Sequence, residues 1–335
     1  MKSKIFNCAV IGLGVGMRHV NVFIKSKNTN LIAICDINTL KRNKIKKLFP
    51  KNIKIYKNFK KLVDNENLDI ISIATYDDLH FEQLIYCLKK NINIIVEKPM
   101  CLKFNQLDKL FKLSFKNKIL IFSNLTLRGN DYFKKIKQDI LKNKYGDIYY
   151  LSGDYIYGRI NKIIYGWRSK IKNYSIILGG AIHIIDLINW FKDKKVISVF
   201  TIGNKSTTNN TNFKYKDFSL IILKFEDGSI AKITANFAAN LPHRHLIELH
   251  GKKKSLFLDY NKSYSFSKAD LNKIELVDLK KFKYDKEFIL KSNIKNILSK
   301  NYNETINQFN LMSISLSAEK SLKSGKWERV KYYSA

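Results

Sequence analysis

Residues 5–11 read IFNCAVI and residues 12–19 read GLGVGMRH, and this stretch decides the fold of the first half of the chain. The first seven residues predict a buried strand, and a helical pattern follows the glycines over residues 20–26. A strand, a glycine-rich turn and a helix, in this order, form the context of a dinucleotide-binding fingerprint. The sequence therefore predicts a dinucleotide site at its start.

Each glycine of this turn has a separate expected role. Gly12 permits the tight turn, and Gly14 lets the backbone approach a pyrophosphate, whose charge the N-terminus of a helix favours. The pattern is imperfect, because the third glycine of G-x-G-x-x-G falls on Met17 and Gly16 stands one position early.

An acidic residue follows at a suitable distance. A second apolar strand, 30–35, ends in Asp36, which lies 22 residues after Gly14. A carboxylate at this place accepts hydrogen bonds from an adenosine ribose. It also repels a 2′-phosphate, so NAD is the expected cofactor. Lys41 and Arg42 could contact such a phosphate instead, which leaves NADP open.

Strands and helices alternate through the first third of the chain. Apolar segments that predict strands are 5–11, 30–35, 53–56, 69–74, 92–97 and 118–122, and residues 39–49 and 81–90 predict two of the intervening helices. Such alternation predicts a parallel sheet with right-handed crossovers.

The pattern changes after Ser123. Helices are predicted at 133–141 and 305–322, and strands at 147–157, 196–203, 218–225, 229–237, 246–250 and 255–258. The turn 226–228, Glu-Asp-Gly, is a hairpin signal. We therefore expect residues 1–123 to form the dinucleotide-binding domain, and residues 124–335 to form an α+β domain with a mainly antiparallel sheet.

Two charged residues end the strand in residues 92–99, which read INIIVEKP. The carboxyl ends of parallel strands are where open α/β sheets bind ligands. A buried strand has no structural need for Glu97 and Lys98 at that end. A functional role competes here with a surface ion pair at the strand exit.

A second polar pair interrupts the segment 179–191, which is apolar on every side and predicts a buried helix. His183 and Asp186 are three residues apart and so share one face. Burying an ionisable pair costs free energy unless its members satisfy each other or a ligand. The pair is either structural or a histidine poised for proton transfer beside a carboxylate.

Composition narrows the function classes. Lys and Arg number 61 against 28 Asp and Glu, which gives a net charge of +33. Only seven of the 61 are arginine, and the lysines are spread along the chain rather than gathered in one stripe. A nucleic-acid footprint needs clustering, so no nucleic-acid partner is expected.

The four cysteines are scattered and form no C-x-x-C pair, as expected for a reducing cytoplasm. The start, residues 1–11, lacks the small-residue cleavage site of a signal peptide. No stretch approaches the roughly 20 apolar residues of a membrane span. We expect a cytoplasmic protein.

The order of these motifs resembles the Gfo/Idh/MocA oxidoreductase family, which includes glucose–fructose oxidoreductase and inositol dehydrogenase. The motifs that carry the likeness are the glycine turn, Asp36, Ala74-Thr75, His80, Glu97-Lys98-Pro99, His183-x-x-Asp186 and the closing segment from Glu319 to Lys326. The resemblance implies a doubly wound Rossmann domain followed by an antiparallel-sheet domain, with the nicotinamide between them. It also implies a homo-oligomer formed through the second sheet.

The resemblance assigns roles residue by residue. It implies that the catalytic residues are Lys98, His183 and Asp186. It implies that the residues around the cofactor are Gly12, Gly14, Gly16, Met17, Asp36, Ala74, Thr75, His80, Glu97 and Lys98. The chain also departs from the family pattern. Many members carry a catalytic aspartate four residues before the helix histidine, where this chain has Gly179. This departure argues against inositol and suggests polysaccharide or sugar-nucleotide metabolism.

The expected reaction is reversible oxidation of a secondary alcohol of a sugar, sugar nucleotide or cyclitol. His183 takes the hydroxyl proton, Asp186 orients it, and Lys98 stabilises the developing alkoxide; Lys98 could instead be the base. The alternative is a dinucleotide-binding or regulatory protein of the same fold without catalysis.

An aromatic–arginine cluster suggests where the substrate binds. Tyr155 belongs to it, and with Lys98, His183 and Asp186 the expected substrate residues are Tyr157, Arg159, Trp167 and Arg168. Stacking and bidentate donors suit a sugar or its phosphate, while a solvated sheet face is the competing interpretation. His243 and His245 lack further ligands, so no metal site is predicted.

Overall fold

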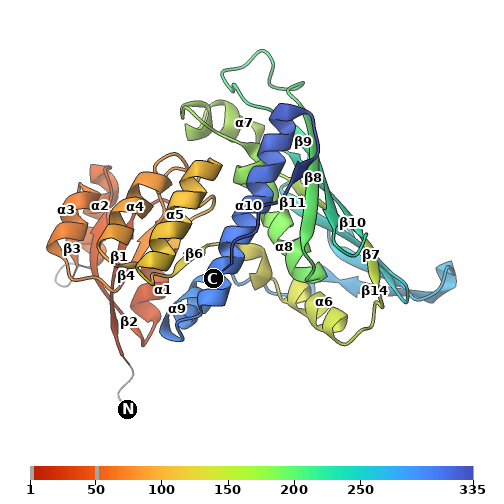
Figure 1. Ribbon diagram of the computed structural model, residues 1–335, viewed down its shortest axis with the longest axis horizontal. Helices are drawn as coiled ribbons and strands as arrows, with labels where there is room; N and C mark the ends of the chain where they lie inside the picture. Colours follow the sequence, from red (N-terminus) through yellow and green to blue (C-terminus); the bar gives the residue numbers. More distant parts are fainter. Residues whose placement is uncertain (1–3, 50–52, 335) are drawn as a thin grey trace. The chain divides into compact units, whose positions relative to one another are not determined.

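The computed structural model describes residues 4–49 and 53–334. The chain divides into two compact units (Figure 1). The first comprises residues 1–125, 287–310 and 333–335, and the second comprises residues 126–286 and 311–332. None of the helices in the described ranges has the length and apolar character needed to cross a membrane.

The first unit is built on a six-stranded parallel sheet. Its strand order is β3-β2-β1-β4-β5-β6, in which the direction of the order reverses between β1 and β4. This is the doubly wound arrangement of a dinucleotide-binding domain, as predicted. The strands are β1 (Phe6–Ile11), β2 (Thr29–Cys35), β3 (Lys54–Tyr56), β4 (Ile70–Ile73), β5 (Asn93–Val96) and β6 (Ile121–Ser123). Every residue of β4 is buried, which explains its unbroken apolar run.

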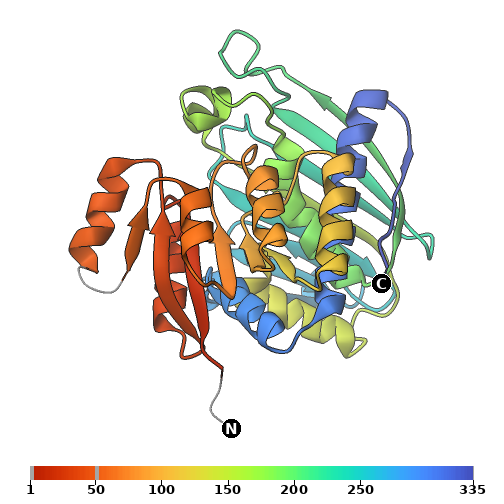
Figure 2. The ribbon, with the colours of Figure 1, turned by 60° about the vertical axis from the view of Figure 1, so that its left-hand side comes forward.

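Helices connect these strands. They are α1 (Gly16–Lys25), α2 (Thr39–Leu48), α3 (Phe59–Asn65), α4 (His80–Lys89) and α5 (Phe104–Lys116). Asparagine side chains cap two of them: Asn38 accepts from the backbone of Lys41 before α2, and Asn58 accepts from the first turn of α3. Helices α4 and α5 lie side by side (Figures 1 and 2).

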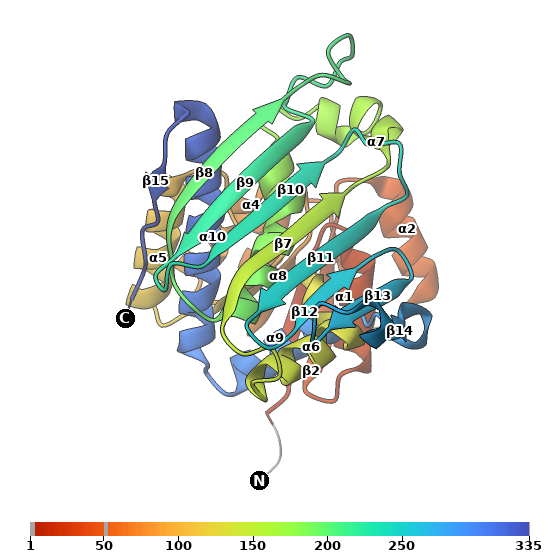
Figure 3. The same ribbon diagram turned by 90° about the vertical axis from the view of Figure 1, so that its right-hand side faces the viewer.

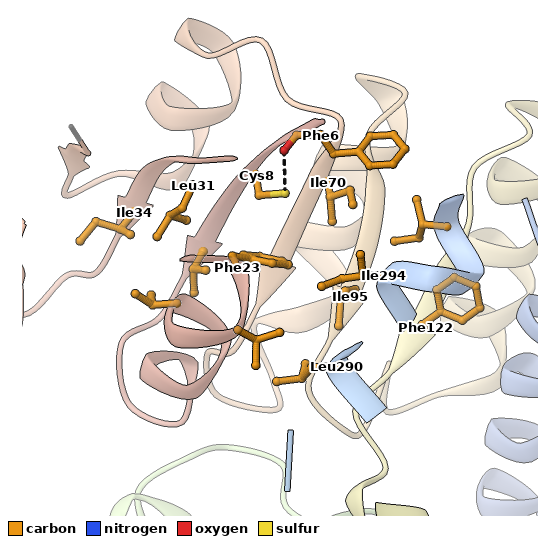
Figure 4. Packing of buried hydrophobic residues seen from close by; sticks show 14 of the residues in the cluster. Phe6, Cys8, Phe23, Leu31, Ile34, Ile70, Ile95, Phe122, Leu290 and Ile294 are labelled. Atoms are coloured by element: carbon orange, nitrogen blue, oxygen red, sulfur yellow. Dashed lines mark hydrogen bonds between the residues drawn. The ribbon is translucent and has the colours of Figure 1, made fainter. Parts of the chain in front are cut away.

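The end of the chain returns to the first unit. Helix α9 (Phe288–Leu298) places Leu290, Ile294 and Ile297 in the same hydrophobic core as Phe23 of α1 (Figure 4). The first part of α10 (Tyr302–Ser324), up to residue 310, also belongs to this unit. The predicted domains, 1–123 and 124–335, did not include this return. The apolar face of α9 is buried only against residues that lie far away in the sequence, near the start of the chain.

The second unit is built on a nine-stranded sheet of order β14-β13-β12-β11-β7-β10-β9-β8-β15. All neighbours are antiparallel except β7 and β10, so the sheet is mainly antiparallel, as predicted. The strands are β7 (Ile148–Ile156), β8 (Val196–Asn204), β9 (Phe218–Phe225), β10 (Ile230–Asn236), β11 (Arg244–Gly251), β12 (Ser255–Leu258), β13 (Lys262–Phe266), β14 (Ile274–Asp278) and β15 (Glu328–Arg329). The predicted hairpin joins β9 to β10, with Gly228 at φ 82° in the turn.

Helix α8 (Ile182–Lys192) packs on one face of this sheet, behind the strands in Figure 3. The contact is close at Gly153 of β7, where an added Cβ would lie 2.3 Å from the Ile184 side chain. The remaining helices of this unit are α6 (Asp131–Leu141), α7 (Ile160–Ile164) and the second part of α10. Strands β13 and β14 were not predicted, because their sequences alternate without a clear apolar face.

Candidate functional site

The glycine turn of the first unit has the shape that a pyrophosphate site requires. Gly12 adopts φ 87°, and a Cβ there would lie 2.4 Å from the carbonyl oxygen of Ala74. Gly16 is the first residue of α1, and a Cβ there would lie 3.1 Å from side-chain atoms of Val10 and Ala74. Gly16 therefore performs the close helix–strand packing that the sequence pattern expected one position later.

Gly14 differs from its neighbours. A Cβ built on it would meet only the end of the Lys41 side chain, at 3.8 Å. The space in front of Gly14 is therefore open to a ligand, directly before the N-terminus of α1. Met17 packs its side chain against the hydrophobic core, so only its backbone could contribute to a cofactor site.

Asp36 is held rigidly at the end of β2. Its Oδ2 accepts a hydrogen bond from the backbone N–H of Leu13 at 2.7 Å, and its Oδ1 accepts from that of Asn38 at 2.8 Å. Each carboxylate oxygen can accept a second bond, which a ribose hydroxyl can donate. Arg42 donates from Nη1 to the backbone oxygens of Asp36 and Ile37, at 2.7 and 2.9 Å, and from Nη2 to Thr39 Oγ1 at 3.0 Å, so these contacts hold its guanidinium at the start of α2.

A chain of hydrogen-bonded polar side chains, largely buried, runs from β4 to the ends of β5 and β6, next to the turn that carries Lys98. Ser72 Oγ of β4 lies 2.5 Å from His19 Nδ1 of α1, and His19 Nε2 lies 3.0 Å from Glu97 Oε1. Asn124, which follows β6, donates from Nδ2 to the same Oε1 at 2.7 Å. The chain thus connects three neighbouring strands and α1.

The charge of Glu97 fixes the orientation of its partners. Removal from water raises the pKa of the carboxyl, but the bonds from His19 and Asn124 and the charge of His19 outweigh this and lower the pKa to about 2. Glu97 is therefore an acceptor only, so His19 donates from Nε2 and Asn124 presents its amide nitrogen. The Oδ1 of Asn124 consequently faces away from Glu97, and it is buried without a hydrogen-bond partner among the described residues.

These observations support a dinucleotide cofactor. The open space at Gly14 and the carboxylate of Asp36 suit the pyrophosphate and the adenosine ribose. The Oδ1 of Asn124, at the carboxyl edge of the second half of the sheet, suits the amide group of a nicotinamide, because that half binds the second nucleotide in this fold. The residues of the first unit therefore fit NAD.

The remaining predicted cofactor residues form the rim near β4 and β5. Thr75 Oγ1 donates to Gln83 Oε1 at 2.7 Å. His80, buried at the start of α4, has Nδ1 2.7 Å from the backbone oxygen of Pro99 and Nε2 3.3 Å from that of Thr75. His80 therefore connects the turn after β4 to the turn that carries Lys98. Lys98 itself is half-buried.

The predicted helix of the second unit carries His183 in its first turn, directly after a π-helical turn, Ile177–Ala181. The imidazole of His183 stacks on Tyr155 of β7 with ring centroids 5.9 Å apart. Asp186 is fully buried, and Arg128 donates to both of its carboxylate oxygens, from Nε at 3.0 Å and from Nη2 at 2.5 Å. Asp186 thus anchors α8 through Arg128, a partner that the sequence did not reveal.

The packing of Tyr174 explains why position 179 is a glycine. An added Cβ would lie 2.3 Å from the hydroxyl oxygen of Tyr174, so this phenol occupies the space that a side chain at position 179 would need. Arg168 Nε donates to the same hydroxyl at 3.0 Å. Gly179 precedes His183 by one helical turn. A phenol held by an arginine therefore stands where the family resemblance implies a carboxylate.

The structure brings the predicted aromatic–arginine cluster together. Arg168 also donates from Nη1 to the Tyr157 hydroxyl at 3.2 Å, and its guanidinium lies 4.6 Å from the Trp167 ring centroid. The guanidinium of the exposed Arg159 also lies near Tyr157, with Cζ 5.8 Å from the centroid of its ring. Tyr157 itself is buried, which confines its role to its edge and hydroxyl.

The sequence analysis missed five residues of the polar chain around Glu97 and of the surroundings of His183: Ser72, His19, Asn124, Arg128 and Tyr174. His19 was visible as a histidine on the helix after the glycine turn. Arg128 was visible through the scarcity of arginine. Nothing in the sequence indicated the contacts of Asn124 and Tyr174, because they depend on side chains distant in the chain.

We expect Glu97→Gln to lower the free energy of unfolding by about 3 kcal/mol at neutral pH, because it removes the negative charge to which His19 and Asn124 donate. The carboxylate stabilises the folded state fully above its usual pKa of 4.5, and this contribution is lost as the pH falls toward about 2. Urea unfolding of wild type and variant should therefore converge over that interval. Glu82→Gln, which removes an exposed partner of Lys60, is the control and should cost less than about 1 kcal/mol. A pH-independent difference for Glu97→Gln contradicts the assignment.

We also expect Gly179→Ala to lower the free energy of unfolding by about 1–3 kcal/mol, because the new methyl group overlaps the Tyr174 ring. In a Tyr174→Ala background the same substitution should cost clearly less, since its obstacle is gone. A double-mutant cycle from thermal and urea unfolding measures this coupling. Additive losses would show that Tyr174 is not the obstacle.

Comparison with known proteins agrees with this geometry. Residues 6–124 match an oxidoreductase family described as having an NAD-binding Rossmann fold, and residues 133–257 match the GFO/IDH/MocA C-terminal domain. The predicted family, fold and NAD cofactor are thereby confirmed.

Among curated proteins, myo-inositol 2-dehydrogenase of Thermotoga maritima is 24% identical over 255 residues, which cover 75% of this chain and 74% of that protein. Among solved structures, myo-inositol 2-dehydrogenase of Lactobacillus plantarum superposes with a TM-score of 0.80 at 20% identity, over 98% of this chain and 100% of that one. Scyllo-inositol dehydrogenase of Lactobacillus casei, solved with NAD(H) and scyllo-inositol, gives 0.76 at 16% identity, over 97% and 99%. The two matching domains together show that the chain belongs to the Gfo/Idh/MocA family of NAD-binding oxidoreductases.

Proposed function

We propose that the protein transfers hydride between NAD and a secondary alcohol of a sugar, sugar nucleotide or cyclitol. The observation that carries this proposal is the surrounding of His183, whose imidazole stacks on Tyr155 beside the cluster of Tyr157, Trp167 and Arg168. Aromatic faces and fixed donors of this kind suit a polyhydroxylated ring. Relatives named for activity on inositols support the substrate class.

The residues divide the work as follows. NAD supplies the hydride acceptor when it is bound. His183 takes the proton of the reacting hydroxyl, and Lys98, as an ammonium, donates a hydrogen bond to the same oxygen and stabilises its developing charge. Asp186 acts as a positioning residue, because Arg128 occupies both of its carboxylate oxygens.

We further propose NAD rather than NADP, because the carboxylate of Asp36 would repel a 2′-phosphate and Arg42 is engaged by backbone oxygens. The four cysteines are free and buried, which supports a cytoplasmic enzyme. The face of the nine-stranded sheet turned away from α8 carries exposed apolar residues such as Ile202 and Phe257 (Figure 3), which supports a homo-oligomer formed through this sheet.

We expect Gly14→Ala and Gly12→Ala to separate cofactor binding from folding. Gly14→Ala meets open space, so it should keep the wild-type melting temperature while weakening NAD binding at least about tenfold through contact with the pyrophosphate. Gly12→Ala is strained and overlaps Ala74, so it should lower the free energy of unfolding by about 1–3 kcal/mol. NADH fluorescence titration and thermal unfolding measure the two effects. Unchanged NADH affinity in Gly14→Ala would contradict the proposal that the pyrophosphate binds at this turn.

We expect Lys98→Met and His183→Asn each to reduce turnover by about 10²–10⁴-fold, because each removes a group that acts on the reacting hydroxyl. NADH affinity should stay within about twofold to threefold of wild type in both variants, a change of well under 1 kcal/mol. Steady-state reduction of NAD⁺ with cyclitols, sugars and sugar nucleotides provides the measurement. Normal turnover in Lys98→Met refutes its role. Failure of every alcohol to reduce NAD⁺ with the wild type favours a regulatory protein.

A further inference from the structure

A pocket lies in the second unit, apart from the residues assigned above. The start of β11, the turn after β12 and the start of α6 enclose a volume of about 210 Å³. The residues that determine its chemistry are Asn130, Tyr132, Arg244, His245, Tyr260 and Tyr284. His245 also touches the aromatic surroundings of His183, since its ring centroid lies 5.2 Å from that of Tyr155. The pocket therefore borders the region in which the sugar is proposed to bind.

Arg244 makes this pocket unusual. Its guanidinium lies over Tyr260, with Cζ 4.4 Å from the ring centroid, so this ring is one of its contacts. Its Nε is buried and has no hydrogen-bond partner among the described residues. A buried donor without an acceptor is costly, and a guanidinium presents several donors in a fixed fork. The arrangement suits an oxyanion that accepts from this fork.

The surrounding charge favours an anion. His243, next to Arg244, has a pKa lowered by removal from water and by the charges of Arg159 and Lys286, so positive groups converge on this end of β11. Removal from water and the proximity of His243 lower the pKa of His245 to about 3, so it stays neutral. Asp259 is the carboxylate that lines the pocket, and its side chain is exposed at the rim. Arg244 is thus matched by one exposed carboxylate among the lining residues, and a second cation, Lys286, lies 5.4 Å from the ring of Tyr284, which lines the pocket.

The size of the pocket limits its occupant. Pockets that hold a whole small ligand usually measure about 300–1,000 Å³, and this one is smaller. It therefore suits one group of a substrate whose sugar ring lies elsewhere. A phosphate or a carboxylate fits both the volume and the planar donor fork.

We propose that the pocket binds a phosphate or carboxylate group of the substrate through the guanidinium of Arg244, so that the enzyme acts on an anionic sugar. The inference rests on the proposed function and narrows it from sugars and cyclitols in general to sugar phosphates, nucleotide sugars or uronic acids. Arg244 serves as a specificity residue, and the hydride-transfer residues stay the same.

The first test is substrate preference. NAD⁺ reduction is measured with myo-inositol and glucose as neutral probes, glucuronate as a carboxylate probe, and glucose 1-phosphate and a UDP-sugar as phosphate probes. We expect kcat/KM to be higher for at least one anionic class, and the preferred class identifies the bound group. Arg244→Gln should raise KM for that class by about 10–100-fold with little change in kcat, which is the loss expected for a charged hydrogen bond. Arg244→Lys should recover part of the loss, and Arg329→Gln, which removes an exposed arginine of the same unit, should behave as wild type.

The second test does not depend on turnover. Inorganic phosphate and glucuronate are titrated against the melting temperature of wild type, Arg244→Gln and Arg329→Gln. Stabilisation of wild type and Arg329→Gln by the anions, but not of Arg244→Gln, supports anion binding in the pocket. This holds even if no alcohol reduces NAD⁺, because the absence of NAD⁺ reduction would overturn only the proposed function. Efficient oxidation of neutral probes with equal kinetics in Arg244→Gln and Arg329→Gln overturns the inference and leaves the proposed function intact. Equal stabilisation of all three proteins by the anions overturns it as well.

Discussion

The largely buried carboxylate of Glu97, whose side chain is 14% exposed, is the interaction on which the first unit depends. Removing a carboxylate from water costs several kcal/mol, and only donors held in fixed positions repay it. His19 comes from α1 and Asn124 from the end of β6, while Ser72 of β4 holds the far side of the imidazole. The glycine turn, the second half of the sheet and the turn that carries Lys98 are therefore fixed by one charge. Because Glu97 directly precedes Lys98, the bonds of Glu97 also fix the position of the Lys98 backbone.

The second unit repeats this arrangement with different residues. Asp186 is a buried carboxylate three residues after His183, and Arg128 satisfies both of its oxygens. Close contacts then limit the start of α8, because Gly180 leaves no room for a Cβ against Phe237 and Tyr155, and Gly179 leaves none against Tyr174. Each residue proposed to act on the substrate hydroxyl thus stands beside a buried carboxylate whose cost is met by a partner from another element.

The sequence predicted what depends on local pattern. The glycine turn, the strand that ends in Glu97 and Lys98, the hairpin after Phe225 and the apolar helix with His183 were all found where expected. Partners that come from distant elements were not predicted. Asn124 reaches Glu97 only because β5 and β6 pair, and Arg128 reaches Asp186 across the unit. The return of α9 to the first core was missed for the same reason, since its apolar face has meaning only beside α1.

The seven arginines separate chemistry from composition in this lysine-rich chain. Most lysines are exposed, where isolated ion pairs contribute little to stability. Arginine occurs where a fork of donors is required: Arg42 binds two backbone oxygens, Arg128 binds a buried carboxylate, and Arg168 joins two phenols. A lysine could replace none of these contacts, because it presents a single flexible charge. Arginines with such contacts are therefore informative, unlike the exposed Arg329. A guanidinium that lies over an aromatic ring and keeps a buried Nε without a partner among the described residues indicates a ligand rather than a surface charge.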